Sequence, residues 1–222
     1  MFGAVAPRYD LLNRLLSCRR DVAWRRLSAR ALALPTDSLI LDVCCGTGDQ
    51  ALAVQSCGYR VVATDFCLPM LALARRKYAK RSGPVPGGMA GDTLELPFAD
   101  ATFGGLTVSF GLRNVADLEA GLREIARVLK PGGRVSFIEA AVPANLLRRP
   151  YLFYFTKVLP WIGRRLSGRG SAYSYLPESV LDFPQRERFV QLMEASGLAC
   201  GAWRDLSAGA VCLYTGNKEN PR

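Results

Sequence analysis

The stretch "LDVCCGTGDQA" (residues 41–51) passes from apolar residues through an aspartate into two glycines on either side of a threonine. An apolar run that ends in such a turn is typical of a buried parallel strand followed by a helix. The glycines permit a tight turn and let a ligand approach the backbone closely. The loose G-x-G-x-x-A pattern leaves three interpretations open, namely a dinucleotide turn, a cradle for S-adenosylmethionine and an ordinary strand-to-helix turn.

Short apolar runs recur along the chain and predict further strands. They cover residues 38–43, 60–65, 104–110 and 134–140, with a weaker run at 85–90 that proline and glycine interrupt. Between them, leucine and isoleucine at helical spacing predict a helix from Asp117 to Lys130, ended by the Pro-Gly-Gly that follows. Strands that alternate with helices predict a doubly wound, mostly parallel α/β sheet of the Rossmann type.

Two segments interrupt this alternation, and we expect both to cover one end of the sheet. The first is an N-terminal helical cap over residues 1–34, and the second is a lid or substrate insertion over residues 143–184. After the insertion, residues 185–197 predict a helix, and two strands at 199–206 and 209–216 form a C-terminal antiparallel pair. A length of 222 residues suits one domain, so residues 1–222 are expected to form a single unit.

The composition limits the metal sites and the binding partners that are expected for the chain. The chain has no histidine, and its seven cysteines form no C-x-x-C pair, so no metal site is expected. The formal net charge of +10 favours phosphate backbones or anionic lipid headgroups as partners. No run reaches the ~18 apolar residues that span a bilayer, and the charged N-terminus does not match a signal peptide, which predicts a cytoplasmic protein.

Acidic residues follow the expected strands and favour a cationic cofactor. Asp65 ends the second strand, where a carboxylate can accept both hydroxyls of a ribose, and Asp92 follows the third strand, where it can meet an adenine amino group. A pyrophosphate would be repelled at this edge of the sheet, whereas a sulfonium and an α-amino group would be attracted. The acids expected there are Asp42, Asp49, Asp65, Asp92 and Glu95.

Longer motifs carry a family resemblance. These are "GDTLELPFADATF" (91–103), "SFGLRNVAD" (109–117), "RVLKPGGR" (127–134) and the block around "AYSYL" (172–176). On these residues the chain resembles the ubiquinone/menaquinone C-methyltransferase family over nearly its whole length. The resemblance implies a class I methyltransferase fold and transfer of a methyl group from S-adenosylmethionine to the ring of a polyprenylated quinol precursor of menaquinone or ubiquinone.

The site residues are assigned from the acids and from the resemblance together. Those predicted to bind S-adenosylmethionine are Asp42, Gly46, Thr47, Gly48, Asp65, Asp92, Thr93 and Ser109. The resemblance places Arg113 beside the quinol ring, where it would stabilise a phenolate or orient a water, and Asn114 would add a hydrogen bond. Without the resemblance, these two residues would be interpreted as a helix entry, with a solvated arginine and an asparagine cap. Further ring neighbours are expected among Tyr151, Tyr154, Tyr173 and Tyr175.

The segment 146–169 combines six cations with aromatic and leucine residues and contains no acid. One interpretation is a surface that contacts anionic headgroups at the inner face of the cell membrane and meets the polyprenyl tail. A solvated, arginine-rich lid remains the other. A nucleic-acid partner is not expected, although a methyltransferase acting on nucleic acid or on another small molecule is the alternative function. The oligomeric state stays open, with a homodimer among the options.

Overall fold

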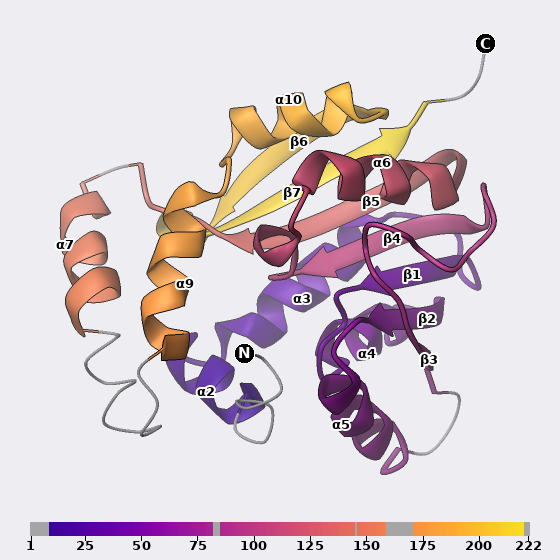
Figure 1. Ribbon diagram of the computed structural model, residues 1–222, viewed down its shortest axis with the longest axis horizontal. Coiled ribbons are helices and arrows are strands. Elements are labelled where there is room, and N and C mark those ends of the chain that lie inside the picture. The colour runs from indigo at the N-terminus through magenta and orange to yellow at the C-terminus, as the bar shows by residue number, and fades with distance from the viewer. Residues whose placement is uncertain (1–8, 82–84, 145, 159–170, 220–222) are drawn as a thin grey trace.

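The computed structural model describes residues 9–81, 85–144, 146–158 and 171–219. These residues form a seven-stranded sheet with helices on both faces (Figure 1). The strand order is β3-β2-β1-β4-β5-β7-β6, and β7 runs antiparallel to both of its neighbours while the other pairs are parallel. The predicted doubly wound sheet with a C-terminal antiparallel pair is therefore confirmed.

The strands agree closely with the apolar runs of the sequence. They are β1 (Leu39–Val43), β2 (Arg60–Asp65), β3 (Gly87–Ala90), β4 (Phe103–Ser109), β5 (Leu129–Ala140), β6 (Leu198–Leu206) and β7 (Val211–Lys218). The helices are α2 (Tyr9–Leu16), α3 (Arg20–Ala31), α4 (Asp49–Gln55), α5 (Leu68–Tyr78), α6 (Leu118–Val128), α7 (Arg148–Phe153), α9 (Ser171–Asp182) and α10 (Glu187–Ala195). Shorter turns are η2 (Leu112–Asn114), η3 (Tyr154–Val158) and η4 (Ser207–Gly209).

The start of β5 differs from the prediction. Helix α6 ends at Val128 and β5 begins at Leu129, so the Pro-Gly-Gly segment lies inside the strand. Leu129 pairs with Phe103 of β4, and the register then shifts before Gly105 pairs with Arg134. Gly132 adopts a φ of 71°, which favours glycine. The segment that was expected to separate a helix from a strand is thus an irregularity within the strand.

The sheet is buried on both faces, as a parallel sheet requires. On one face α6 and α10 contribute Leu122, Ile125, Phe189 and Met193, all fully buried, to one hydrophobic cluster. On the other face α3, α4 and α5 form a second cluster. Helix α3 therefore belongs to the layer that covers the sheet, whereas α2, α7 and α9 lie beyond the carboxyl ends of β4 and β5 (Figure 1). Among the described residues of the predicted N-terminal cap, those of α2 lie over the end of the sheet (Figure 1).

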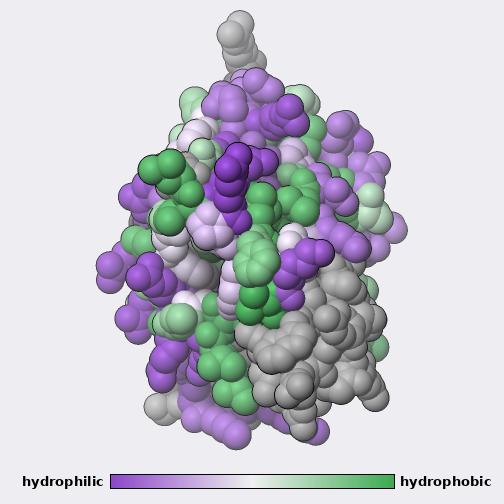
Figure 2. All heavy atoms as spheres, turned by 90° about the vertical axis from the view of Figure 1, so that its left-hand side faces the viewer, coloured by the Kyte–Doolittle hydropathy of each residue, from purple (hydrophilic) through white to green (hydrophobic). Residues whose placement is uncertain are grey.

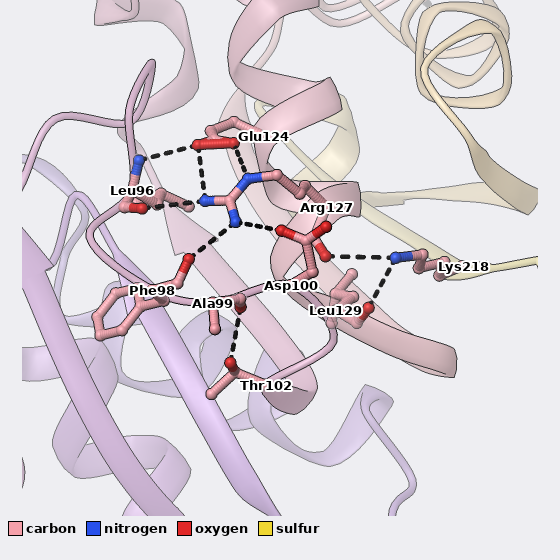
Figure 3. A network of polar contacts seen from close by, with 9 residues as sticks. All are labelled: Leu96, Phe98, Ala99, Asp100, Thr102, Glu124, Arg127, Leu129 and Lys218. Carbon is pink, nitrogen blue, oxygen red and sulfur yellow. Dashed lines mark hydrogen bonds and ion pairs between the residues drawn. The ribbon is translucent and has the colours of Figure 1, made fainter.

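The long connection from β3 to β4 is fastened to α6 by one arginine (Figure 3). The guanidinium of Arg127 donates to the carbonyls of Phe98 (2.8 Å) and Leu96 (3.0 Å) and pairs with the carboxylates of Glu124 and Asp100. Glu124 in turn accepts a hydrogen bond from the Leu96 N–H at 3.0 Å. Because this connection contains "GDTLEL" (91–96), the network fixes the segment that carries the predicted Asp92 and Thr93.

Candidate cofactor and substrate pockets

The glycine loop between β1 and α4 contains three residues with left-handed backbone conformations, Cys44 (φ 53°), Gly46 (φ 54°) and Gly48 (φ 83°). A Cβ atom at Gly48 would lie 2.1 Å from the hydroxyl oxygen of Tyr78, so the packing of α5 also demands a glycine there. At Gly46 a Cβ would meet no atom within 4 Å. The loop therefore leaves open space over Gly46, as a ligand-binding turn does.

Asp65, at the end of β2, faces this loop. Its carboxylate accepts hydrogen bonds from the backbone N–H groups of Gly46 and Cys67, each at 2.8 Å. The side chain is buried, and this burial raises the pKa of Asp65 above its ordinary value although the two N–H donors act in the opposite direction. Asp65 and Gly46 both line a pocket at the carboxyl ends of β1, β2 and β4.

Ser109, the last residue of β4, lines the opposite side of this pocket. Its side chain is only 8% exposed, and its Oγ forms no hydrogen bond with the described residues. A buried hydroxyl without a protein partner is costly unless a ligand or water pairs with it. The open space over Gly46, the acceptor Asp65 and the hydroxyl of Ser109 together fit a ligand such as S-adenosylmethionine, which carries ribose hydroxyls and positive charge.

Besides Gly48, four predicted cofactor residues do not line this pocket. Thr47 donates to the carboxylate of Asp10 in α2 at 2.5 Å. Asp92 is exposed, and its side chain accepts from the N–H of Leu94. Thr93 is buried, with its Oγ1 3.4 Å from the sulfur of Cys44. Asp42, the fourth, is enclosed between β1 and β4.

Asp42 is fully buried, and Thr107 of β4 donates to its Oδ1 at 2.9 Å. Its Oδ2 has no hydrogen-bond partner among the described residues. Burial is the main reason that the pKa of Asp42 is raised to about 7. The structure thus places this carboxylate against the neighbouring strand β4, and it does not line the pocket.

The predicted gathering of acids at this edge needs correction. Lys77 of α5 pairs with Asp49 at 2.5 Å and with Asp10 at 2.7 Å, and Arg14 of α2 lies 3.5 Å from Asp49. Burial opposes ionisation of Asp49, but the hydrogen bond and charge of Lys77 outweigh it and hold its pKa below the ordinary value. Among the five acids, only Asp65 lines the pocket. Neighbouring cations and burial therefore offset most of the negative charge on which the argument against a pyrophosphate relied.

The pKa of Asp42 leads to a prediction about stability. The folded protein keeps a proton on Asp42 up to about pH 7, whereas the unfolded chain releases it near 3.8, so unfolding free energy should fall as pH rises through this window. The shift corresponds to at most roughly 4 kcal/mol. Asp42→Asn keeps the acceptor for Thr107 and cannot ionise, so we expect it to be more stable than the wild type at about pH 8.

Urea denaturation at about pH 5 and about pH 8 measures this difference. The exposed Asp37 provides a matched control, because Asp37→Asn makes the same chemical change at a solvated turn and should leave the pH dependence unaltered. If wild type and Asp42→Asn lose the same unfolding free energy between the two pH values, the buried carboxyl is ionised in the folded protein and the interpretation is wrong.

A second, larger pocket adjoins the first. Its volume is about 200 Å³, and aromatic and aliphatic side chains form most of its wall. They come from α3, the end of β4, the α7–η3 segment and α9, and include Trp24, Phe110, Tyr151, Phe155 and Leu176. Phe110 lines both pockets, so a ligand in one lies next to a ligand in the other.

The backbone of Phe110 is held in a left-handed conformation with a φ of 61°. Its N–H donates to the carbonyl of Ile138 at 2.8 Å, and its carbonyl accepts from Nη1 of Arg113 at 2.7 Å. The same nitrogen lies 2.8 Å from the carboxylate of Glu139, and both charged side chains are buried. Such a conformation is costly for a non-glycine residue and is found mostly at functional sites.

The structure separates the two predicted catalytic residues. Arg113 lines the larger pocket, and its burial and ion pair exclude the interpretation as a solvated side chain. Asn114 lines the smaller pocket instead, and the cap of α6 is Asp117, whose carboxylate accepts from the N–H of Ala120. Tyr151 and Tyr154 line the larger pocket, whereas the side chains of Tyr173 and Tyr175 lie outside the described residues.

The sequence did not single out several residues that the structure places at the larger pocket. Asp21, Trp24 and Arg25 come from α3, and Phe110 directly follows β4; Glu139 of β5 does not line the pocket but pairs with Arg113, which does. The ring of Trp24 lies 6.1 Å from that of Phe110, and the guanidinium of Arg25 lies 5.6 Å from the same ring. Helical spacing places Asp21, Trp24 and Ser28 on one side of α3, but it does not show which part of the sheet that side faces.

Comparison with known proteins identifies the class. A putative methyltransferase from Haloferax volcanii, solved in complex with the Trm112 methyltransferase activator, has the same fold with a TM-score of 0.68. Its sequence identity is 16%, and the match covers 99% of this chain and 98% of that one. The doubly wound sheet is that of a class I methyltransferase, and together with the methyltransferase family described next it confirms the predicted fold, the enzyme class and S-adenosylmethionine as the cofactor.

Sequence comparison specifies the family. Residues 1–218 match the ubiE/COQ5 methyltransferase family, and the chain belongs to it. It is 44% identical to the ubiquinone/menaquinone biosynthesis C-methyltransferase UbiE of Geobacter sulfurreducens, over 98% of this chain and 87% of the relative. It is 43% identical to the demethylmenaquinone methyltransferase of Deinococcus radiodurans, over 98% of this chain and 91% of the relative.

Proposed function

We propose that the protein methylates a ring carbon of a polyprenylated quinol in the biosynthesis of menaquinone or ubiquinone. The relatives named for these reactions support the substrate class. The observation that carries the proposal is the shared wall at Phe110, which sets an aromatic-lined pocket beside the pocket for the methyl donor. A flat, apolar ring fits such a pocket, and the chain provides a buried cation at its edge.

The smaller pocket holds the cofactor in this proposal. When bound, S-adenosylmethionine supplies an electrophilic methyl group on a positively charged sulfur. Asp65 accepts hydrogen bonds from the ribose hydroxyls, Ser109 pairs its buried hydroxyl with the ligand, and Gly46 leaves the room that a side chain would fill. The two loops around this pocket are shaped by Thr47, Gly48, Asp92 and Thr93. Asp42 supports the pocket from strand β1.

Arg113 supplies electrostatic stabilisation at the larger pocket. Methylation of an aromatic carbon needs electron density on the ring, and loss of a phenolic proton provides it. Arginine stays protonated at neutral pH, so Arg113 stabilises the phenolate and does not act as the base. Glu139 holds the guanidinium in place, and the aromatic wall keeps the ring in a fixed orientation and excludes water. Asn114 contributes a polar group at the boundary with the cofactor pocket.

We further propose that residues 1–222 form one domain in which α2 and the 143–184 insertion act as a lid. Asn13 and Leu16 of α2, Tyr151 and Phe155 of the α7–η3 segment, and Leu176 of α9 all line the larger pocket. Asp10 of α2 also contacts Thr47 and Lys77 near the glycine loop. Segments from both ends of the insertion and from the N-terminus thus cover the same opening.

The assay of this function uses the purified protein, S-adenosylmethionine and short-tailed quinols. Mass spectrometry should show the addition of one methyl group to a demethylmenaquinol or to the corresponding ubiquinol precursor, and the preferred substrate assigns the pathway. Calorimetry run in parallel should show binding of S-adenosylmethionine. Binding of the cofactor with no methylation of either quinol would contradict the proposed substrate class.

The face that carries α7 is proposed to contact an anionic membrane surface. Within the described residues, no helix is long and apolar enough to cross a membrane. Leu146 is 99% exposed, Phe153 66% and Leu11 of α2 68%, close in sequence to Arg148 and Arg149 or to Arg14. Figure 2 shows hydrophobic groups interspersed with hydrophilic ones on the side of the molecule where α7 lies. An enzyme that methylates a lipid-soluble quinol has to reach its substrate at such a surface.

Liposome flotation tests this contact. We expect the wild type to bind anionic vesicles at low salt and to release them at high salt, and Arg148→Gln/Arg149→Gln to bind at least tenfold more weakly, because each cation contributes about 1 kcal/mol near an anionic surface. Arg75→Gln/Arg76→Gln on α5 removes the same charge from another exposed helix as a control. Equal flotation of all three proteins would leave the α7 segment with a lid function only.

A further inference from the structure

The wall of the larger pocket contains one carboxylate among its described residues, that of Asp21. Asp21 lies in the first turn of α3 and is 4% exposed. The hydroxyl of Ser17 donates to its Oδ1 at 2.9 Å, and within the described part of the chain the carboxylate forms no ion pair. Asp21 lines this pocket and an adjoining cleft, and a buried carboxylate in the wall of an aromatic-lined pocket is suited to interact with an O–H group of the ligand.

The other ionisable groups near this pocket cannot take up a proton from a phenol. Glu139 is 1% exposed, and its oxygens already pair with Arg113 and with the N–H of Ala140. Arg113 is a cation with donors only. Burial raises the pKa of Tyr151 to about 12, so this phenol is protonated at neutral pH. Asp21 is the remaining acceptor in the described wall.

We propose that Asp21 is a catalytic residue that accepts the phenolic proton of the quinol as the methyl group is transferred, an inference that rests on the proposed function. The proton leaves the phenolic oxygen for the Asp21 carboxylate, and the ring carbon forms its bond to the methyl carbon. The electron pair of the broken S–CH3 bond stays on sulfur. The methylated carbon then loses its hydrogen as a proton to water, Asp21 returns its proton to the oxygen, and the reaction releases one proton overall.

The position of Asp21 complements that of Arg113. Arg113 stabilises the negative oxygen once it has formed, whereas Asp21 provides the group that receives the proton, and both line one pocket whose wall is continuous with the cofactor pocket through Phe110. The guanidinium of Arg25, one turn after Asp21 on α3, packs on the ring of Phe110. The same helix therefore supplies the proton acceptor and a cation that supports the wall residue between the two pockets.

The test compares wild type with Asp21→Asn over a range of pH on a short-tailed quinol. Asparagine keeps an acceptor for Ser17 but cannot take up the proton, so the methyl-transfer rate near neutral pH should fall about a hundredfold or more. The rate of the variant should rise about tenfold per pH unit toward the pKa of the phenol, about 10, because the substrate must then ionise by itself. The affinity for S-adenosylmethionine, measured by calorimetry, should stay within about threefold.

The pH profile is interpreted against the charged and titratable groups that face Asp21. Arg14, Arg25, Arg26, Arg81 and Asp49 line a smaller cleft on the other side of Asp21. Arg113, Tyr151 and Tyr154 line the same pocket as Asp21. These groups are shared by wild type and variant, so a change in the shape of the profile reports Asp21 itself.

Two further variants complete the experiment. Asp21→Glu keeps a carboxylate and should recover part of the rate, whereas Asp37→Asn makes the same chemical change at an exposed turn and should be as active as the wild type. An Asp21→Asn profile that has the wild-type shape at a lower level, or a rate within threefold of wild type, overturns the role of Asp21. A wild type that methylates no quinol overturns the proposed function instead, so the two failures are distinguishable.

Discussion

Replacing Arg113 by lysine is expected to lower the methyl-transfer rate at least a hundredfold while S-adenosylmethionine still binds. Nη1 of the guanidinium contacts both the Phe110 carbonyl and the Glu139 carboxylate, at 2.7 and 2.8 Å, and an ammonium group that took its place would lack the second terminal nitrogen of the planar fork as a donor for the phenolate. Loss of one preorganised donor to a developing oxyanion costs about 10²–10³ in rate. Lysine is preferred to alanine because alanine would leave Glu139 buried without a counter-charge, which destabilises a protein by about 3–5 kcal/mol.

Quinol methylation and calorimetric binding of the cofactor, measured on the same preparation, separate the two pockets. Arg123→Lys on the exposed side of α6, where Arg123 pairs only with Glu119, makes the same change and should leave both quantities unaltered. The assignment of Arg113 to the quinol would be wrong if its replacement strongly weakened cofactor binding while the methyl-transfer rate at saturating cofactor stayed at the wild-type value.

The order and type of the elements were predictable because the sheet is parallel and buried on both faces. Each strand of this kind appears in the sequence as a short apolar run, and β1, β2 and β4 begin and end within a residue of the predicted bounds. The start of β5 was missed because Pro-Gly-Gly usually ends a helix, and the sequence gives no sign that Leu129 pairs with Phe103 across a register shift. That pairing depends on contacts between segments distant in sequence.

The site was predictable only where a motif and a strand end coincide. Asp65, Gly46 and Ser109 stand at such ends and line one pocket. Asp42 was assigned to the cofactor from its position in the motif, yet side chains alternate along a strand, and the alternation turns Asp42 toward Thr107 inside the sheet. Trp24 and Asp21 could not be assigned, because nothing in the N-terminal sequence reveals that α3 passes beside the end of β4.

Asp65→Ala is expected to weaken binding of S-adenosylmethionine at least tenfold. The ionised carboxylate would accept two hydrogen bonds from ribose hydroxyls, each worth roughly 1.5–3 kcal/mol before water compensates for part of the loss. Glu119→Ala, which removes an exposed carboxylate from α6, is the matched control and should bind as the wild type does. Isothermal calorimetry measures the affinity of both variants. An unchanged dissociation constant for Asp65→Ala would show that the ribose does not bind at Asp65.

The pKa of Asp65 adds a second test of the same assignment. Burial raises this pKa, so the carboxylate takes up a proton at a higher pH than an ordinary aspartate does, and a neutral carboxyl is a weaker acceptor. Affinity of the wild type for the cofactor should therefore decrease as pH is lowered, beginning above the ordinary value of 3.8. Asp65→Asn cannot titrate at this position, so its affinity should lack this decrease, and the ratio between the two proteins should shrink toward acidic pH. A ratio that stays constant down to pH 3.8, the ordinary pKa of an aspartate, would mean that Asp65 does not contact the ligand as an ionised group.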